Sequence, residues 1–158
     1  MAISKLCAVF QIGPDVETSI PYDVIVYEDV IQFHLEKCDA VCFDGDVLFT
    51  ITRNKSEAFK ADIRRCLKRL HNLHIAHKDV KPSNILYCQR LKKFVLCDYG
   101  CAEYVQEEIG QLSKTVLAGT GKFMGPEMLE ILTNTKRRKV VDLYYNDVYA
   151  SQVALSML

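Results

Sequence analysis

A regular pattern of apolar residues runs through residues 57–73, EAFKADIRRCLKRLHNL. The apolar positions recur at steps of three or four, and they are Phe59, Ile63, Cys66, Leu67, Leu70 and Leu73. Because this spacing places those side chains on one side of an α-helix, it predicts an amphipathic helix packed on a core. Ser56 is a suitable N-cap for this helix, and Glu57 suits the positive end of the helix dipole.

Shorter apolar runs on both sides of this helix predict strands. Residues 22–35, YDVIVYEDVIQFHL, are rich in β-branched and aromatic side chains and predict one or two strands, and residues 39–43, DAVCF, predict a shorter one. The runs ILYC at 85–88 and KFVLC at 93–97 are separated by a short polar stretch, which favours a β-hairpin. Residues 146–158, NDVYASQVALSML, predict the start of a buried helix.

The stretch 98–127 has no sustained periodicity. It contains the glycines Gly100, Gly110, Gly119, Gly121 and Gly125, of which Gly100 would give the chain conformational freedom at the start of the loop. A loop of this length is uncommon in a compact domain unless it has a function or is disordered. The stretch is therefore a candidate functional segment.

Composition restricts the class of protein and its partners. The chain has 158 residues, 49% of them hydrophobic and 25% charged, which is typical of a soluble globular domain. Its 20 basic and 20 acidic residues cancel, so neither nucleic acid nor an anionic membrane is expected as a partner. Since no apolar run is long enough to span a bilayer and the first residues lack a signal-peptide pattern, we expect a cytoplasmic or nuclear location.

The seven cysteines are an odd number and are scattered along the chain, which favours reduced thiols over a disulfide framework. Two CxxxC spacings, Cys38/Cys42 and Cys97/Cys101, lie in a chain that also has histidines at 71, 74 and 77, so a zinc site is an alternative. It is disfavoured because structural zinc sites usually have closely paired CxxC spacings.

The stretch HIAHKDVKPSNIL, residues 74–86, concentrates polar side chains around a proline and reads as a loop that leads into a strand. Most such loops are only solvated connections. Transfer of a phosphoryl group, however, needs a carboxylate to orient the attacking hydroxyl, a cation near the phosphate and oxygen ligands for Mg²⁺. Asp79 and Lys81 supply the first two requirements, and Asn84 and Asp98 offer oxygen atoms that could hold the metal.

Three motifs, in order, resemble those of eukaryotic protein kinases. HKDVKPSN at 77–84 resembles the catalytic loop H-R-D-x-x-x-x-N, DYG at 98–100 resembles D-F-G, and GPE at 125–127 resembles A-P-E. Lys81, together with the Gly119-Thr120 pair, resembles kinases that phosphorylate serine and threonine. The resemblance implies a protein serine/threonine kinase that uses ATP and Mg²⁺ and acts on a protein substrate.

The resemblance also assigns roles to individual residues. Asp79 would accept or orient the proton of the substrate hydroxyl, Lys81 would steady the γ-phosphate, and Asn84 and Asp98 would hold Mg²⁺. Adenine would lie against the backbone near Cys42 and Asp44, with Leu86 beneath the ring. Asp147 would hold the backbone of the catalytic loop.

The implied fold is α+β and protein-kinase-like, with a mostly helical C-lobe and a truncated β-rich N-lobe. Residues 1–46 would be a remnant of the N-lobe and the hinge, and residues 47–158 would be a partial C-lobe. Ser113, Thr115 and Thr120 fall in the segment that resembles an activation loop, where phosphorylation of Ser113 or Thr115 could order the chain through a nearby cation.

The sequence departs from the family pattern in several places. Lys78 stands where the family usually has arginine and lacks the planar fork that grips a phosphate, and Tyr99 replaces phenylalanine and adds a hydroxyl that needs a partner if buried. No glycine-rich motif precedes residue 38, and Lys5 and Glu17 are weak candidates for the phosphate-anchoring lysine and its partner. A catalytically impaired pseudokinase that binds partners is therefore an alternative.

Two further alternatives are weaker. A kinase of small molecules is disfavoured because the segment 119–127 resembles a peptide-binding loop. The basic run at 136–139 could contact acidic substrate residues or act as a nuclear signal, although such runs are usually solvated surface.

Overall fold

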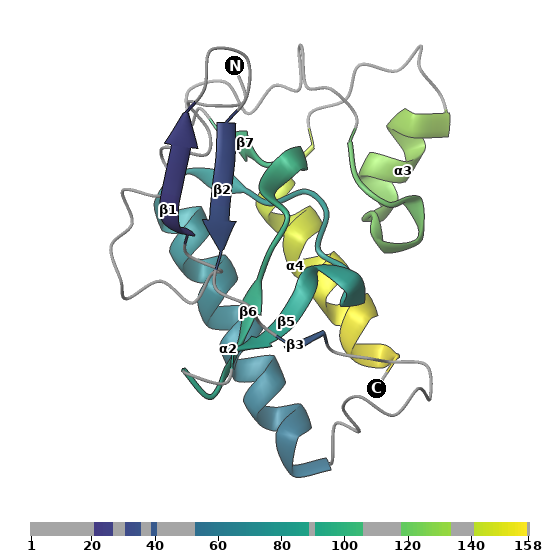
Figure 1. Ribbon diagram of the computed structural model, residues 1–158. Coiled ribbons are helices and arrows are strands. Elements are labelled where there is room, and N and C mark those ends of the chain that lie inside the picture. Colours follow the sequence, from purple (N-terminus) through teal and green to yellow (C-terminus); the bar gives the residue numbers. More distant parts are fainter. Residues whose placement is uncertain are drawn as a thin grey trace.

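The computed structural model describes residues 21–26, 31–35, 39–40, 53–88, 91–105, 118–133 and 141–157. Its helices are α2 (Arg53–Asn72), α3 (Pro126–Thr133) and α4 (Leu143–Ser156), and its strands are β1 (Pro21–Val26), β2 (Ile31–Leu35), β3 (Asp39–Ala40), β4 (Ile75–Ala76), β5 (Ile85–Cys88), β6 (Lys93–Leu96) and β7 (Glu103–Tyr104). Single 3₁₀ turns lie at Pro82–Asn84, Tyr99–Cys101 and Gly121–Phe123. This part of the chain is mostly helical with a small β portion, which agrees with the expected α+β class (Figure 1).

The strands form small antiparallel sheets. The run at 22–35, predicted to form one or two strands, contains most of β1 and all of β2, which pair with each other, and β3, β5 and β6 form a sheet in the order β3-β5-β6. Ile85 lies opposite Leu96 and Cys88 opposite Lys93, so the expected hairpin of β5 and β6 is confirmed. The short strands β4 and β7 also pair, with Ala76 opposite Glu103, and this pair was not expected from the sequence because two-residue strands carry no periodicity.

Helix α2 is the predicted amphipathic helix, but it begins one turn earlier. It starts at Arg53, so Ser56 lies inside its first turn and the prediction that Ser56 is the N-cap was wrong. No proline or glycine separates residue 53 from residue 56, so nothing in this stretch stops the helical hydrogen bonding. At the other end, His74 has a φ of 58° and donates its backbone N–H to the carbonyl of His71, which ends the helix.

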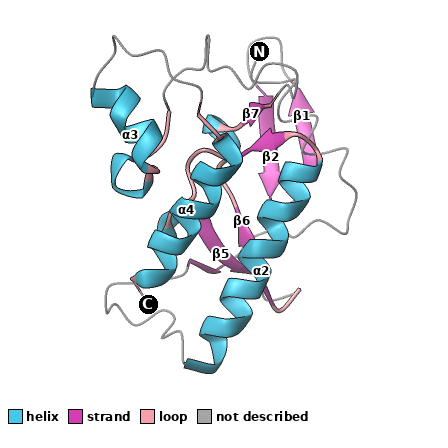
Figure 2. Ribbon diagram, turned by 180° about the vertical axis from the view of Figure 1, so that it is seen from behind, coloured by secondary structure: helices cyan, strands magenta, loops and turns pink. Residues whose placement is uncertain are grey.

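The core lies between α2, the β5–β6 hairpin and α4, and Figure 2 shows the two long helices side by side. Phe59 of α2 is fully buried and meets the ring of Phe94 in β6 edge to face, with the ring centroids 5.0 Å apart. Ala150 and Ala154 of α4 belong to the same cluster. Small side chains on α4 allow it to approach α2 closely, so the hairpin and both helices share one core.

The last helix, α4, begins at Leu143 rather than at residue 146 because Asp142 caps it: the Asp142 carboxylate accepts a hydrogen bond of 2.9 Å from the N–H of Tyr145. Helix α3, which begins at the end of the stretch 98–127, was not predicted from the sequence. Pro126 occupies the first position of α3, where its missing N–H has no consequence.

Several sequence predictions lie outside the described residues. They concern the strand residues 41–43, the hinge residues Cys42 and Asp44, the candidate lysine and glutamate at 5 and 17, the sites Ser113 and Thr115, and the basic run 136–139. In the described part, no helix combines the length and the apolar character that a bilayer crossing requires.

Candidate active site

The loop that contains Asp79 is held by hydrogen bonds to Asp147 of α4. The Asp147 side chain is fully buried, and its carboxylate accepts hydrogen bonds of 2.7 Å from the N–H of His77 and 2.8 Å from the N–H of Lys78. These two bonds confirm that Asp147 holds the backbone of the loop. They also compensate a buried negative charge that would otherwise be costly.

A second contact to Asp147 comes from helix α2. His71 Nε2 lies 3.1 Å from Asp147 Oδ2, and the His71 ring stacks on Tyr144 with centroids 4.4 Å apart. Asp147 therefore connects α2, α4 and the loop at one carboxylate. From the sequence, His71 was considered only as a possible zinc ligand, and its contact with Asp147 was missed because the two residues are 76 positions apart.

His77 is completely buried and its hydrogen bonds define its protonation. Nδ1 accepts the N–H of Asp79 at 3.3 Å, so the ring proton must lie on Nε2, which donates to the carbonyl of Cys97 at 3.0 Å. Burial lowers the pKa of His77 despite the nearby charge of Asp147. A neutral His77 thus ties the backbone of Asp79 to the end of β6.

The Asp79 carboxylate is the centre of a hydrogen-bonded cluster. Oδ2 accepts from Lys81 Nζ at 2.7 Å and from Asn84 Nδ2 at 3.1 Å, and Oδ1 accepts from the Thr120 hydroxyl at 2.8 Å. Burial works to raise the pKa of Asp79, but the hydrogen bonds from Lys81, Thr120 and Asn84 and the charge of Lys81 outweigh it, so the pKa of Asp79 is lowered. Asp79 is therefore an ionised carboxylate with fixed orientation.

Lys81 bridges Asp79 and Thr120. Its Nζ also lies 3.0 Å from the Thr120 hydroxyl oxygen, and the hydrogen bond to Asp79 raises the pKa of Lys81, so the ammonium form is favoured. Sequence reasoning noted the Gly119-Thr120 pair as a family resemblance but did not place Thr120 on Asp79. The two residues are 41 positions apart, and only the folded chain brings them together.

The β5–β6 hairpin brings Asn84 and Asp98 to the same end of the sheet. The N–H of Cys97 donates to the carbonyl of Asn84 at 2.9 Å, so Asp98 follows directly after the residue paired with Asn84. The amide nitrogen of Asn84 is used by the carbonyl and carboxylate of Asp79, which leaves its oxygen as the group that could hold a metal.

Asp98 lies on the exposed side of this arrangement. Its φ of 59° is left-handed, and its carboxylate accepts the N–H of Gly100 at 3.2 Å. The unusual conformation at the start of the loop therefore belongs to Asp98, and Gly100 is not among the residues with positive φ, contrary to expectation. An aspartate tolerates this conformation better than most side chains do.

The donors at Asn84 and Asp98 suit Mg²⁺, which binds hard oxygen atoms and commonly uses one or two protein ligands together with phosphates and water. Within the described ranges, no group of three or more His, Cys, Asp or Glu side chains could hold a metal ion by itself.

Leu86 lies in the middle of the three-stranded sheet. It pairs with Ala40 of β3 on one side and Val95 of β6 on the other, and it is half-buried. Cys42 and Asp44 follow β3 by only a few positions in the sequence, but their own placement lies outside the described residues. The proposed adenine site thus has one described member.

Two thiols flank the DYG motif. Burial, with a smaller contribution from Asp98, raises the pKa of Cys97 to about 11, and burial also raises the pKa of Cys101. Between them, the hydroxyl of Tyr99 reaches the carbonyl of Leu96 at 3.4 Å and its ring lies 5.0 Å from that of His77. The hydroxyl that distinguishes Tyr99 from phenylalanine therefore has a partner.

Gly119 lies in close contact with the backbone of the loop at Lys78. It has a φ of 123°, and a Cβ atom at this position would lie 2.4 Å from the carbonyl oxygen of Lys78. Only glycine fits such a contact. The close approach of Gly119 to Lys78 is what places Thr120 against Asp79.

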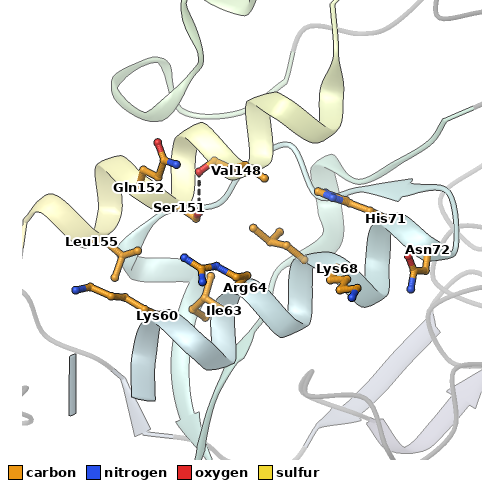
Figure 3. A pocket seen from close by; sticks show the side chains of 11 residues that line it. Lys60, Ile63, Arg64, Lys68, His71, Asn72, Val148, Ser151, Gln152 and Leu155 are labelled. Atoms are coloured by element: carbon orange, nitrogen blue, oxygen red, sulfur yellow. Dashed lines mark hydrogen bonds between the residues drawn. The ribbon is translucent and has the colours of Figure 1, made fainter. Parts of the chain in front are cut away.

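A cavity of about 250 Å³ lies elsewhere, between α2 and α4 (Figure 3). Its lining includes Ile63 and Arg64 of α2 and Val148 and Leu155 of α4. None of Asp79, Lys81, Asn84 and Asp98 lines this cavity, so it is separate from the cluster around Asp79.

Comparison with known proteins identifies the family of the chain. The family model for the protein kinase domain matches residues 21–154. The chain is 38% identical to human cell division cycle 7-related protein kinase over 71 residues, which are 45% of this chain and 12% of that protein. It is 30% identical to rabbit MAP kinase-activated protein kinase 2 over 120 residues, which are 67% of this chain and 31% of that protein. It is also 48% identical to a non-specific serine/threonine protein kinase of Drosophila melanogaster over 42 residues, 27% of this chain and 6% of that protein.

The Asp79 carboxylate is thus held by a lysine and an asparagine, and Asp98 follows the neighbouring strand of the hairpin. The chain belongs to the protein kinase family, because the family model covers most of its length. It spans less than a third of the length of these relatives.

Proposed function

We propose that this chain carries the catalytic part of a protein serine/threonine kinase, which transfers the γ-phosphoryl group of ATP to a hydroxyl of a protein substrate. The observation that supports this proposal most is the cluster on Asp79, where one carboxylate is bonded to Lys81 at 2.7 Å, Thr120 at 2.8 Å and Asn84 at 3.1 Å. An ionised carboxylate with a lysine held beside it is the kind of arrangement that gathers at functional sites.

Each side chain has a distinct role in this proposal. Asp79 orients the substrate hydroxyl and accepts its proton as the oxygen attacks the phosphorus, and the bond from the γ-phosphorus to the leaving oxygen of ADP breaks. Lys81 lies beside Asp79 and stabilises the charge on the phosphoryl group in transfer. The lowered pKa of Asp79 keeps it ionised at neutral pH, so it is available as an acceptor.

Asn84 and Asp98 would hold Mg²⁺, and the bound ion would neutralise negative charge on the ATP phosphates. The Asn84 amide is oriented for this by its bonds to Asp79, and Asp98 by its bond to Gly100. We further propose that Leu86, with the backbone near Cys42 and Asp44, contacts the adenine, that residues 1–46 contribute the N-lobe remnant and hinge, and that residues 47–158 form a partial C-lobe.

The test is phosphorylation of a generic basic protein by the purified chain with ATP and Mg²⁺. We expect transfer that requires Mg²⁺ and that falls by about a hundredfold or more in Asp79→Asn, because the amide cannot accept the proton. The matched control is Glu57→Gln, which removes a carboxylate that is bonded to Lys60 at 2.7 Å on the surface of α2 and should leave the rate unchanged. Equal rates in the wild type and Asp79→Asn would reject the role of Asp79.

A non-catalytic kinase-like binding module is the second candidate. It is favoured by one observation: the described strands before residue 41, PYDVIV, IQFHL and DA, contain no lysine that could anchor the α- and β-phosphates. Under this alternative, the wild type and Asp79→Asn would both lack transfer while remaining folded.

A further inference from the structure

The side chain of Lys78 is a buried cation. It is 2% exposed, and its Nζ lies 2.7 Å from Oε2 of Glu103, which is 25% exposed. A lysine withdrawn from water to this extent needs an anionic partner, because an unpaired buried charge is very costly. Glu103 provides that partner from outside the catalytic loop.

Lys78 also connects the surrounding elements. Its backbone N–H donates to Asp147 at 2.8 Å, its carbonyl oxygen forms the close contact with Gly119, and its φ of 68° is left-handed. A residue other than glycine keeps such a backbone conformation only when its surroundings hold it there. Any group that fixes Lys78 therefore fixes the residue immediately before Asp79.

Glu103 is well placed to do this. It lies in β7, opposite Ala76 of β4, and the N–H of the nearby Val105 donates to the carbonyl of His74 at 2.7 Å. These backbone bonds do not involve the Glu103 side chain. The strand pair β4–β7 already aligns the segment after the DYG motif with the chain just before Lys78. The Glu103 carboxylate adds an ion pair between this segment and Lys78.

In many switches a phosphate supplies the anion that orders a loop around a buried or clustered cation. Here the anion at Lys78 is a carboxylate of the chain itself. We propose that Glu103 is a positioning residue for phosphoryl transfer: through Lys78 it holds the catalytic loop in place, so that this loop is ordered without a phosphate group on the chain. The inference concerns the regulation of the site and rests on the proposed function.

The first experiment measures hydrogen exchange of the backbone over residues 75–84 in the full chain. In Glu103→Gln, which keeps the shape but removes the charge, we expect exchange in this loop to be faster by about tenfold, because local opening becomes easier. Glu57→Gln, which removes a surface carboxylate with an equally short lysine contact, should not change it. Unchanged exchange in Glu103→Gln would overturn the inference, whether or not the chain is an active kinase.

The second experiment separates positioning from general stability. In Glu103→Gln we expect kcat to fall by about tenfold or more with KM for ATP within about twofold, since small displacements of a reacting group affect the chemical step. Glu103→Asp, which restores the charge, should recover part of the loss. A lower melting temperature with an unchanged kcat would overturn the positioning role.

The third experiment tests independence from phosphate. Protein treated with a phosphatase, with an intact mass that shows no phosphate, should keep the kcat and the slow loop exchange of the untreated chain. Loss of both on treatment would contradict the inference. If the wild type shows no transfer at all while Glu103→Gln still accelerates exchange, the ordering role of Glu103 stands and the proposed catalytic function fails.

Discussion

At the scale of single residues, the arrangement around His77 is the most sensitive to conditions. The imidazole has no exposed surface, and both ring nitrogens are engaged, one by the amide of Asp79 and one by the carbonyl of Cys97. A second ring proton would displace the amide of Asp79 from Nδ1. The folded chain therefore disfavours protonated His77, which agrees with its lowered pKa.

A pH dependence of stability follows from this. In the unfolded chain His77 titrates near its ordinary pKa of 6.5, whereas in the folded chain its pKa is lower, so the unfolded state gains protons first as the pH falls. We expect the free energy of unfolding to fall below pH 6.5 by up to about 1.4 kcal/mol per pH unit from this residue, measured by urea denaturation between pH 5 and 8.

The variant His77→Gln should reduce this slope, since glutamine does not titrate. His74→Asn is the matched control, because His74 is exposed and asparagine also tolerates its φ of 58°. An identical pH slope in the wild type and His77→Gln would contradict the assignment.

For single residues, the sequence identified those in short motifs and missed those whose contacts form only in the fold. Asp79, Lys81, Asn84 and Asp98 could be singled out because they lie within or beside short motifs. Thr120 and Glu103 could not be joined to Asp79 and Lys78, since their contacts span 41 and 25 positions and leave no local pattern. Their roles depend on how the segments pack.

At the scale of elements, the segment 118–125 lies so close to the loop that contains Asp79 that a Cβ atom on Gly119 would collide with the carbonyl of Lys78. Gly119 makes this possible, whereas Gly121, also in this segment, has nothing within 4 Å of the position where its Cβ would lie. The two glycines therefore form a matched pair for substitution.

We expect Gly119→Ala to lower the free energy of unfolding by about 2 kcal/mol or more, because the methyl group would collide with the carbonyl of Lys78 in a left-handed conformation. Gly121→Ala should change it by no more than about 0.5 kcal/mol. Both values can be measured by chemical denaturation, and equal stability of the two variants would show that the close contact is not required.

The elements themselves were predicted to different degrees. Helix α2 and the β5–β6 hairpin followed from apolar spacing because both bury one face against the same core. Helix α3 was missed because its 8 residues give too few turns for a period to be read, and β4 and β7 because each has only 2 residues. The start of α2 was misplaced because the sequence alone does not distinguish Ser56 inside a helix from a serine at the N-cap.

At the scale of the whole molecule, both α2 and α4 contribute to a single junction at Asp147 that supports the proposed phosphotransfer site. Ligand binding at Asn84 and Asp98 would add to the stability of the entire cooperative unit, because a ligand that binds only the folded state shifts the unfolding equilibrium.

We expect ATP with Mg²⁺ at about a hundred times its dissociation constant to stabilise the chain by about 2.7 kcal/mol, seen as a higher melting temperature. Removal of Mg²⁺ with a chelator should abolish most of the shift, and Asp98→Ala should weaken it, since a carboxylate ligand is lost. Glu57→Gln should retain the full shift. A melting curve of Asp98→Ala that responds to nucleotide and Mg²⁺ as the wild type does would rule out Asp98 as a metal ligand.

Cys97 is adjacent to Asp98, a proposed metal ligand, yet its pKa of about 11 means that only about one molecule in ten thousand carries the thiolate at pH 7. Peroxides and alkylating agents react with the thiolate rather than the thiol. We therefore expect Cys97 to react slowly with oxidants and electrophiles, even though its sulfur atom stands next to the carboxylate of the proposed metal site.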